Sequence, residues 1–70
     1  MKIESGSGGQ MDIFWGQSLE SYDAAIVSAV DAARKILDGK TLEWFEVIEF
    51  RGGFVDGAIQ YQTAVRIGYA

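Results

Sequence analysis

At 70 residues the chain has room for one domain only, and a domain of this size buries just ~60% of the surface that its unfolded chain exposes. It contains no Cys and no His, so disulfides and thiolate metal sites are excluded, and the usual general base and commonest metal ligand are missing. A net charge of −4 argues against nucleic acid or an anionic membrane as a partner, and no apolar run approaches the ~20 residues of a membrane span.

The first ten residues have the composition of a linker, with the run Ser-Gly-Ser-Gly-Gly at residues 5–9. We expect residues 1–10 to be a flexible extension or a cloning remnant without a function of its own, and residues 11–70 to form the domain. The alternative is a first strand at residues 2–4 that turns at the glycines. No apolar core follows Met1-Lys2, so no secretory signal is expected and the predicted location is cytoplasmic.

The next two elements are predicted to be a strand and a long amphipathic helix. Residues 11–15 form a short apolar run that Gly16 ends, which is typical of a strand. Over residues 18–38, apolar side chains recur every three or four positions, which gives a helix with one apolar stripe. Ser18 suits the N-cap of this helix, and Gly39 suits the position just after its end. The stripe comprises Leu19, Tyr22, Ile26, Ala29, Val30, Ala33, Ile36 and Leu37.

Two further strands complete the predicted fold. Residues 42–50 are rich in aromatic and β-branched side chains, and residues 58–69 alternate between apolar and polar. Arg51-Gly52-Gly53 is a turn signal between them, and Asp56-Gly57 is a second one. The order β-α-β-β predicts an α+β fold in which a three-stranded antiparallel sheet wraps partly around one helix.

The first of these two strands carries large apolar side chains on both of its faces. Alternation places Phe45 and Val47 on one face, and Trp44, Ile48 and Phe50 on the other. One helix with one apolar stripe covers only one face of a sheet, so the second face is expected to meet another subunit or a ligand. The predicted core joins Phe45, Val47, Ile59, Tyr61, Val65 and Ile67 of the sheet to Tyr22, Ile26, Val30, Ala33 and Leu37 of the helix.

Trp44 and Gln62 are the first candidates for a ligand site. If the last two strands pair antiparallel, both side chains can lie on the face that the helix leaves open. An indole plane stacks on a flat heteroaromatic ring, and a side-chain amide can donate to and accept from the heteroatoms of such a ring. The alternatives are that the Trp packs in a subunit interface and that the Gln is merely solvated.

The carboxylates of the middle strand are weaker candidates. Alternation does not bring Glu43, Glu46 and Glu49 to one face, and Asp56 lies in a turn. We expect these groups to solvate the surface and to form ion pairs between subunits. The chain also lacks a phosphate-binding glycine loop and a nucleophile elbow. We therefore expect no catalytic residues and no metal ligands, and the protein is predicted not to be an enzyme.

Residues 44–52 read WFEVIEFRG, and residues 61–69 read YQTAVRIGY. These two segments resemble the dodecin family, and residues 16–21, GQSLES, resemble the start of that family's helix. The resemblance covers about residues 11–70. It implies a β-α-β-β subunit, of which twelve form a hollow sphere, with flavins bound as stacked pairs near the threefold axes.

The resemblance also implies roles for three residues. Trp44 would stack on the flavin, Gln62 would contact the edge of the isoalloxazine, and Arg51 matches an Arg that holds the flavin phosphate in some members. The implied function is flavin storage and photochemical quenching by the stacked Trp, with FMN or riboflavin as cofactor. The chain has Ala70 where some members have a second Arg, and one residue fewer near residues 55–57. Some dodecin-like proteins bind no flavin, so a ligand-free or ion-binding structural assembly is the alternative.

Overall fold

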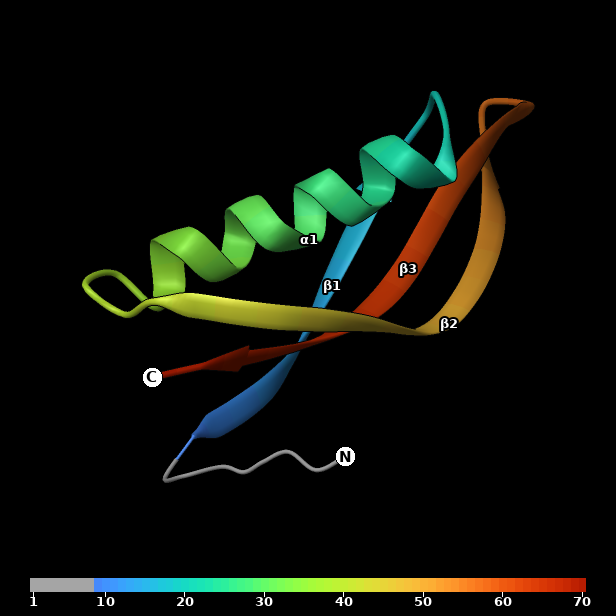
Figure 1. Cartoon of the computed structure of the whole chain (residues 1–70). Helices are drawn as coiled ribbons and strands as arrows, with labels where there is room; N and C mark the ends of the chain where they lie inside the picture. The colour runs from blue at the N-terminus through green and yellow to red at the C-terminus, as the bar shows by residue number, and fades with distance from the viewer. Residues whose placement is uncertain (1–8) are drawn as a thin grey trace.

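One helix lies across a three-stranded antiparallel sheet in the computed structural model, which describes residues 9–70 (Figure 1). The elements are β1 (Gln10–Ser18), α1 (Tyr22–Ile36), β2 (Leu42–Val55) and β3 (Ala58–Tyr69). The strand order is β1-β3-β2, so the last strand of the chain is the middle strand of the sheet. This confirms the predicted α+β fold. Most of the expected extension, and the alternative strand at residues 2–4, lie outside the described residues.

β1 continues past the glycine that was expected to end it. Gly16 lies within the strand, opposite Thr63 of β3, and α1 crosses the sheet directly above it. A Cβ atom at this position would overlap the backbone oxygen of Ala25 and the backbone nitrogen and Cβ of Ala29. Gly16 is therefore required by the close approach of the helix to the strand, and the prediction that it ends the strand was wrong.

The helix begins three residues later than the sequence suggested. Ser21, not Ser18, is the N-cap, and its Oγ accepts a hydrogen bond from the backbone N–H of Ala24 at 3.0 Å. Ser18 is the last residue of β1, and its Oγ accepts from the backbone N–H of Glu20 at 2.9 Å in the connecting turn. The side chain of either serine could cap a helix. Ser21 is the N-cap because Ser18 is still paired with Tyr61 in the sheet. No helix within residues 9–70 is long and apolar enough to cross a membrane.

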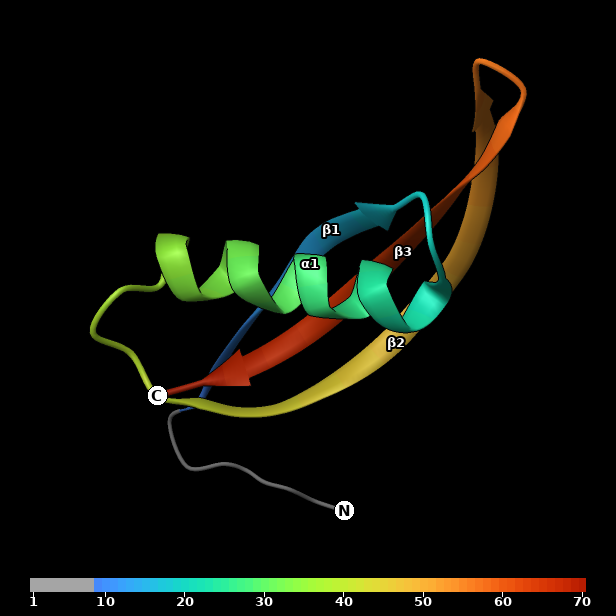
Figure 2. The same ribbon diagram turned by 90° about the horizontal axis from the view of Figure 1, so that it is seen from above.

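The hairpin between β2 and β3 turns at Asp56 and Gly57. Their φ angles of +50° and +82° are those of a two-residue loop with both central residues left-handed, which Asp-Gly favours. The first turn signal, Arg51-Gly52-Gly53, lies inside β2 and pairs with β3, so that prediction was wrong. The longer strands make the hairpin project beyond the start of α1 (Figures 1 and 2).

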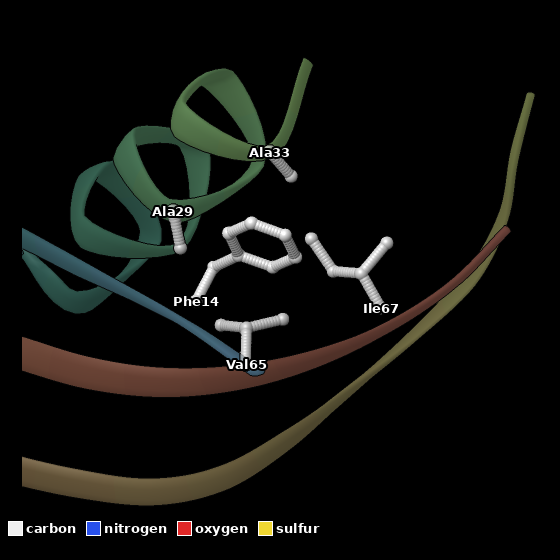
Figure 3. Packing of buried hydrophobic residues seen from close by; sticks show 5 residues of the cluster. All are labelled: Phe14, Ala29, Ala33, Val65 and Ile67. Carbon is white, nitrogen blue, oxygen red and sulfur yellow. The ribbon is translucent and has the colours of Figure 1, made fainter. Parts of the chain in front are cut away.

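The core is small and lies between α1 and the strands β1 and β3. Its buried side chains point toward one another in the space between the helix and the sheet (Figure 3). They are Phe14, Ala29, Ala33, Val65 and Ile67, with Val30, Leu37 and Leu42 packed against them. The alanines of α1 let the helix sit close to the strands, as Gly16 does from the other side.

The predicted core was correct at Val65 and Ile67 of β3, but wrong at Phe45 of β2 and at Ile59 near the start of β3. Val65 and Ile67 are buried, whereas Phe45 is 56% exposed and Ile59 is half exposed; Phe14 was not included. The reason is the strand order, because β3 takes the middle of the sheet beneath α1 and leaves β2 at the edge beyond the helix (Figure 2).

A β-bulge in β2 changes which residues share a face. Val47 pairs with Val65 and Glu49 pairs with Ala64, so Ile48 is the extra residue. After the bulge the alternation is inverted. Phe50 therefore lies on the helix side, where its ring centroid is 4.9 Å from that of Tyr22 in an edge-to-face contact, and not beside Trp44 as predicted.

Tyr69 of β3 forms a side-chain hydrogen bond with Asp12 of β1. Its hydroxyl donates a hydrogen bond to Oδ2 of Asp12 at 2.8 Å, and this bond, together with burial and the carboxylate charge, raises the pKa of Tyr69 above its ordinary 10.0. The pKa of Tyr69 is thus higher in the folded protein than in the unfolded chain. The hydrogen bond therefore contributes its full stability at pH values below the unfolded pKa, and this contribution is lost as the pH rises through the folded pKa.

We expect Tyr69→Phe to lower the melting temperature at neutral pH and to lose this effect in alkali. The measurement is thermal unfolding of both proteins at intervals between about pH 8 and pH 12. The difference between them should shrink above about pH 10, because the wild-type phenol ionises next to Asp12. A difference that stayed constant over this range would show that the hydrogen bond does not stabilise the fold.

Candidate functional site

The sheet face turned away from α1, called here the outer face, carries all three predicted site residues. Residues that are directly paired share a face, and the buried Val65 and Ile67 mark the opposite one. The outer face comprises Trp44, Glu46, Glu49 and Arg51 of β2; Gln62, Ala64, Arg66 and Gly68 of β3; and Met11, Ile13, Trp15 and Gln17 of β1. Pairing arranges these residues in rows that cross the sheet from β2 through β3 to β1.

Trp44 lies at one end of the outer face. It pairs with Gly68, and its indole occupies the space where a side chain at that position would stand. Any residue other than glycine at position 68 would displace the ring. Trp44 is 46% exposed, although so large an apolar residue is usually mostly buried. The arrangement presents an aromatic surface to whatever meets this end of the sheet.

Arg51 and Gln62 lie together at the other end of the face. They are direct partners across β2 and β3. Both line a depression of about 360 Å³, which is within the ~300–1,000 Å³ of ligand sites. The side-chain amide of Gln62 donates to Oε1 of Gln60 at 2.9 Å. The guanidinium of Arg51 supplies positive charge and planar donors, so the depression offers a polar, cationic surface.

Within one subunit, Trp44 and Gln62 are too far apart to contact the same ligand ring. The partner of Trp44 is Gly68, which is six residues from Gln62 along β3, or about 20 Å of extended strand. The prediction that both side chains share a face is confirmed. A flat ligand that contacts both types of group must therefore take them from two different subunits.

The carboxylates of β2 are arranged differently from the prediction. The bulge at Ile48 brings Glu46 and Glu49 to the same face, where each meets an arginine of its own chain. Glu46 accepts a hydrogen bond from Arg66 at 2.7 Å, and the Oε2 of Glu49 is 3.3 Å from Nε of Arg51. These pairs are exposed, so each contributes little to stability. Within residues 9–70, no three acidic side chains are grouped to hold a metal ion.

Trp15 is the site residue that sequence reasoning missed. It lies on β1 in the same row as Glu49 and Ala64, and it lines the depression beside Gln62. Alternation along β1 does place it opposite Phe14, on the other face from the core. Its neighbours could not be predicted, because they depend on the position of β3 between β1 and β2.

The comparisons with known proteins agree in family and in fold. The model of the Dodecin family matches residues 13–70. A dodecin from Thermus thermophilus is 40% identical over 55 residues, which are 77% of either chain. The structure of a dodecin from Streptomyces davaonensis superposes with a TM-score of 0.79 at 33% identity, covering 93% of this chain and 94% of that one. A calcium-chelating antigen from Mycobacterium tuberculosis, described as calcium dodecin with a novel calcium-binding site, superposes with a TM-score of 0.74 at 25% identity, covering 89% of this chain and 87% of that one.

Proposed function

This chain belongs to the dodecin family, and we propose that it is a non-catalytic flavin-binding subunit of a homo-oligomeric shell. Trp44 is the residue through which the proposal is most directly tested. The observation that carries the proposal is the indole of Trp44, which is held over Gly68 and half exposed on the open face of the sheet. An exposed indole with a fixed position stacks on a flat heteroaromatic ring at little cost in conformational freedom.

The site is proposed to form between subunits. Trp44 of one subunit stacks on the isoalloxazine, and Gln62 and Arg51 of a neighbour bind its polar edge and, in FMN, its phosphate. The separation of about 20 Å within one chain requires this division of roles. An amide both donates and accepts, which suits the alternating ring heteroatoms, and a guanidinium pairs with phosphate through two parallel hydrogen bonds.

The physiological role that follows is storage and photochemical quenching of FMN or riboflavin in the cytoplasm. An indole in stacking contact can donate an electron to the excited flavin, and return of that electron dissipates the energy without net chemistry. Bound flavin then neither fluoresces nor reacts. Trp44 is the proposed donor because its ring is exposed on the outer face.

Flavin titration tests the proposal. Wild-type protein added to riboflavin or FMN should quench the flavin emission in a saturable manner, with one flavin per subunit at the endpoint. A fluorescence that falls only in proportion to dilution would contradict flavin binding. Ca²⁺ is the second ligand to test, since the Mycobacterium tuberculosis structure is described as a calcium dodecin. Calorimetric binding of Ca²⁺ without any flavin quenching would favour the ion-binding assembly instead.

The assembly itself is the next expected result. α1 leaves most of β2 uncovered, so Phe45 and Phe54 are 56% and 80% exposed, and a groove of about 220 Å³ between α1 and β2 has largely apolar walls. So much apolar surface on a chain of 7.7 kDa favours association with further copies. Sedimentation at micromolar concentration should give a closed homo-oligomer, which we propose to be a dodecamer. A stable monomer would contradict both the assembly and a flavin site that is shared between subunits.

A further inference from the structure

The cation of Arg51 is stacked on Trp15 of the opposite edge strand. Its Cζ atom lies 4.7 Å from the centroid of the indole ring. Arg51 is on β2 and Trp15 on β1, so the arginine side chain reaches diagonally across β3. Between them stands Ala64, which is only 3% exposed although it belongs to the outer face. A small residue at this position leaves the room through which Arg51 extends.

Two contacts fix the orientation of the guanidinium. Its Cζ atom lies over the indole of Trp15, and its Nε atom is 3.3 Å from Oε2 of Glu49. The ion pair with Glu49 is made through Nε, and within residues 9–70 the two terminal nitrogens of Arg51 form no hydrogen bond. The pair of terminal nitrogens is therefore available at the depression that Arg51, Trp15 and Gln62 line together.

Stacking matters here because an arginine side chain is otherwise free to adopt many rotamers. A guanidinium that is already held in place loses less entropy when it binds an anion. Its terminal nitrogens match two oxygens of the FMN phosphate, whereas riboflavin offers only neutral hydroxyl groups, to which hydrogen bonds are weaker. The contact with Trp15 therefore bears on the phosphate and not on the flavin ring.

The geometry points to Trp15 as a positioning residue: by stacking on Arg51 it holds the guanidinium beside Gln62 in the orientation that receives the phosphate of FMN, and so it sets the preference for FMN over riboflavin. This inference rests on the proposed binding of flavin. It adds a specificity determinant on β1, a strand to which neither the sequence motifs nor the proposed function assigns a role.

The test compares Trp15→Leu, Trp15→Phe, Arg51→Met and the double variant Trp15→Leu/Arg51→Met. Each is checked for assembly by sedimentation and is then titrated with FMN and with riboflavin, using quenching of flavin emission. A cation–π contact at an exposed site corresponds to about a two- to fivefold change in affinity. Trp15→Leu should therefore reduce the ratio of FMN to riboflavin affinity by about that factor, and Trp15→Phe should restore most of it.

The double variant decides whether Trp15 acts through Arg51. In the Arg51→Met background, Trp15→Leu should cause no further loss of the preference for FMN. A further loss there, or an equal loss for both flavins in Trp15→Leu alone, would overturn the positioning role while leaving flavin binding intact. If the wild-type protein quenches neither flavin, the proposed function fails and this inference fails with it.

The chain offers a second, ligand-free measurement. It contains only two Trp residues, so the indole emission of Trp44→Phe comes from Trp15 alone. Adding Arg51→Met should then shift or brighten this emission, because the cation leaves the ring. An unchanged spectrum would show that the stacking seen in the structure does not persist in solution, and the inference would be overturned.

Discussion

Replacing Trp44 by Ala is expected to weaken riboflavin binding by roughly 5- to 150-fold. Loss of an aromatic platform under a stacked heterocyclic base costs about 1–3 kcal/mol, and each 1.4 kcal/mol is a factor of ten in affinity. Trp44 has no side chain beneath it, since Gly68 is its partner, so no neighbouring side chain can take over the stacking. Quenching titrations with increasing protein would measure the loss. Any flavin that remains bound should regain its emission.

Two further variants separate the contributions of Trp44. Trp44→Phe keeps an aromatic plane but is a poor electron donor, so it should retain more affinity than Trp44→Ala while quenching much less. Ile13→Ala is the matched control, because Ile13 is an exposed apolar residue of the same face that lies outside the depression. It should bind riboflavin as the wild-type protein does. An affinity in Trp44→Ala equal to that of the control would discard the stacking model.

Gly16→Ala is expected to have the largest effect on stability. The added methyl group would overlap backbone atoms of Ala25 and Ala29, and a backbone cannot yield by changing a rotamer. The helix would have to move away from β1, which would open the small core around Phe14. Overpacking of this kind costs about 3 kcal/mol, which lowers the melting temperature of a domain of this size by roughly 10–20 °C. Thermal unfolding followed by circular dichroism would measure the change.

Gly53→Ala is the control for this substitution. Gly53 also lies inside a strand, but a Cβ atom there would meet nothing within 4 Å. Its replacement should leave the melting temperature unchanged or raise it slightly, because alanine reduces the freedom of the unfolded chain. If both glycine variants were equally stable, the close contact between α1 and β1 would not exist in solution.

The sequence by itself determined the elements and their order. Helical periodicity identified α1, strand alternation identified β3, and an Asp-Gly pair was one of two turn signals between β2 and β3. These features depend on interactions among residues close in the chain, so local chemistry is sufficient to predict them.

Only the tertiary structure decided which elements are neighbours. Periodicity tells which side of a strand is apolar but not where in the sheet the strand lies, so the burial of Phe45 was predicted and did not occur. The bulge at Ile48 inserts one unpaired residue, which inverts the alternation and brings Phe50 to the helix and Glu49 to the face of Glu46.

The candidate site divides in the same way. Trp44, Gln62 and Arg51 could be singled out by residue type and by resemblance, because an indole, an amide and a guanidinium carry their chemistry wherever they stand. Trp15 became part of the site only when β3 was placed between β1 and β2. A contact between two strands that are not adjacent depends on strand order, which is fixed by packing across the whole sheet and leaves no periodic signal in the sequence.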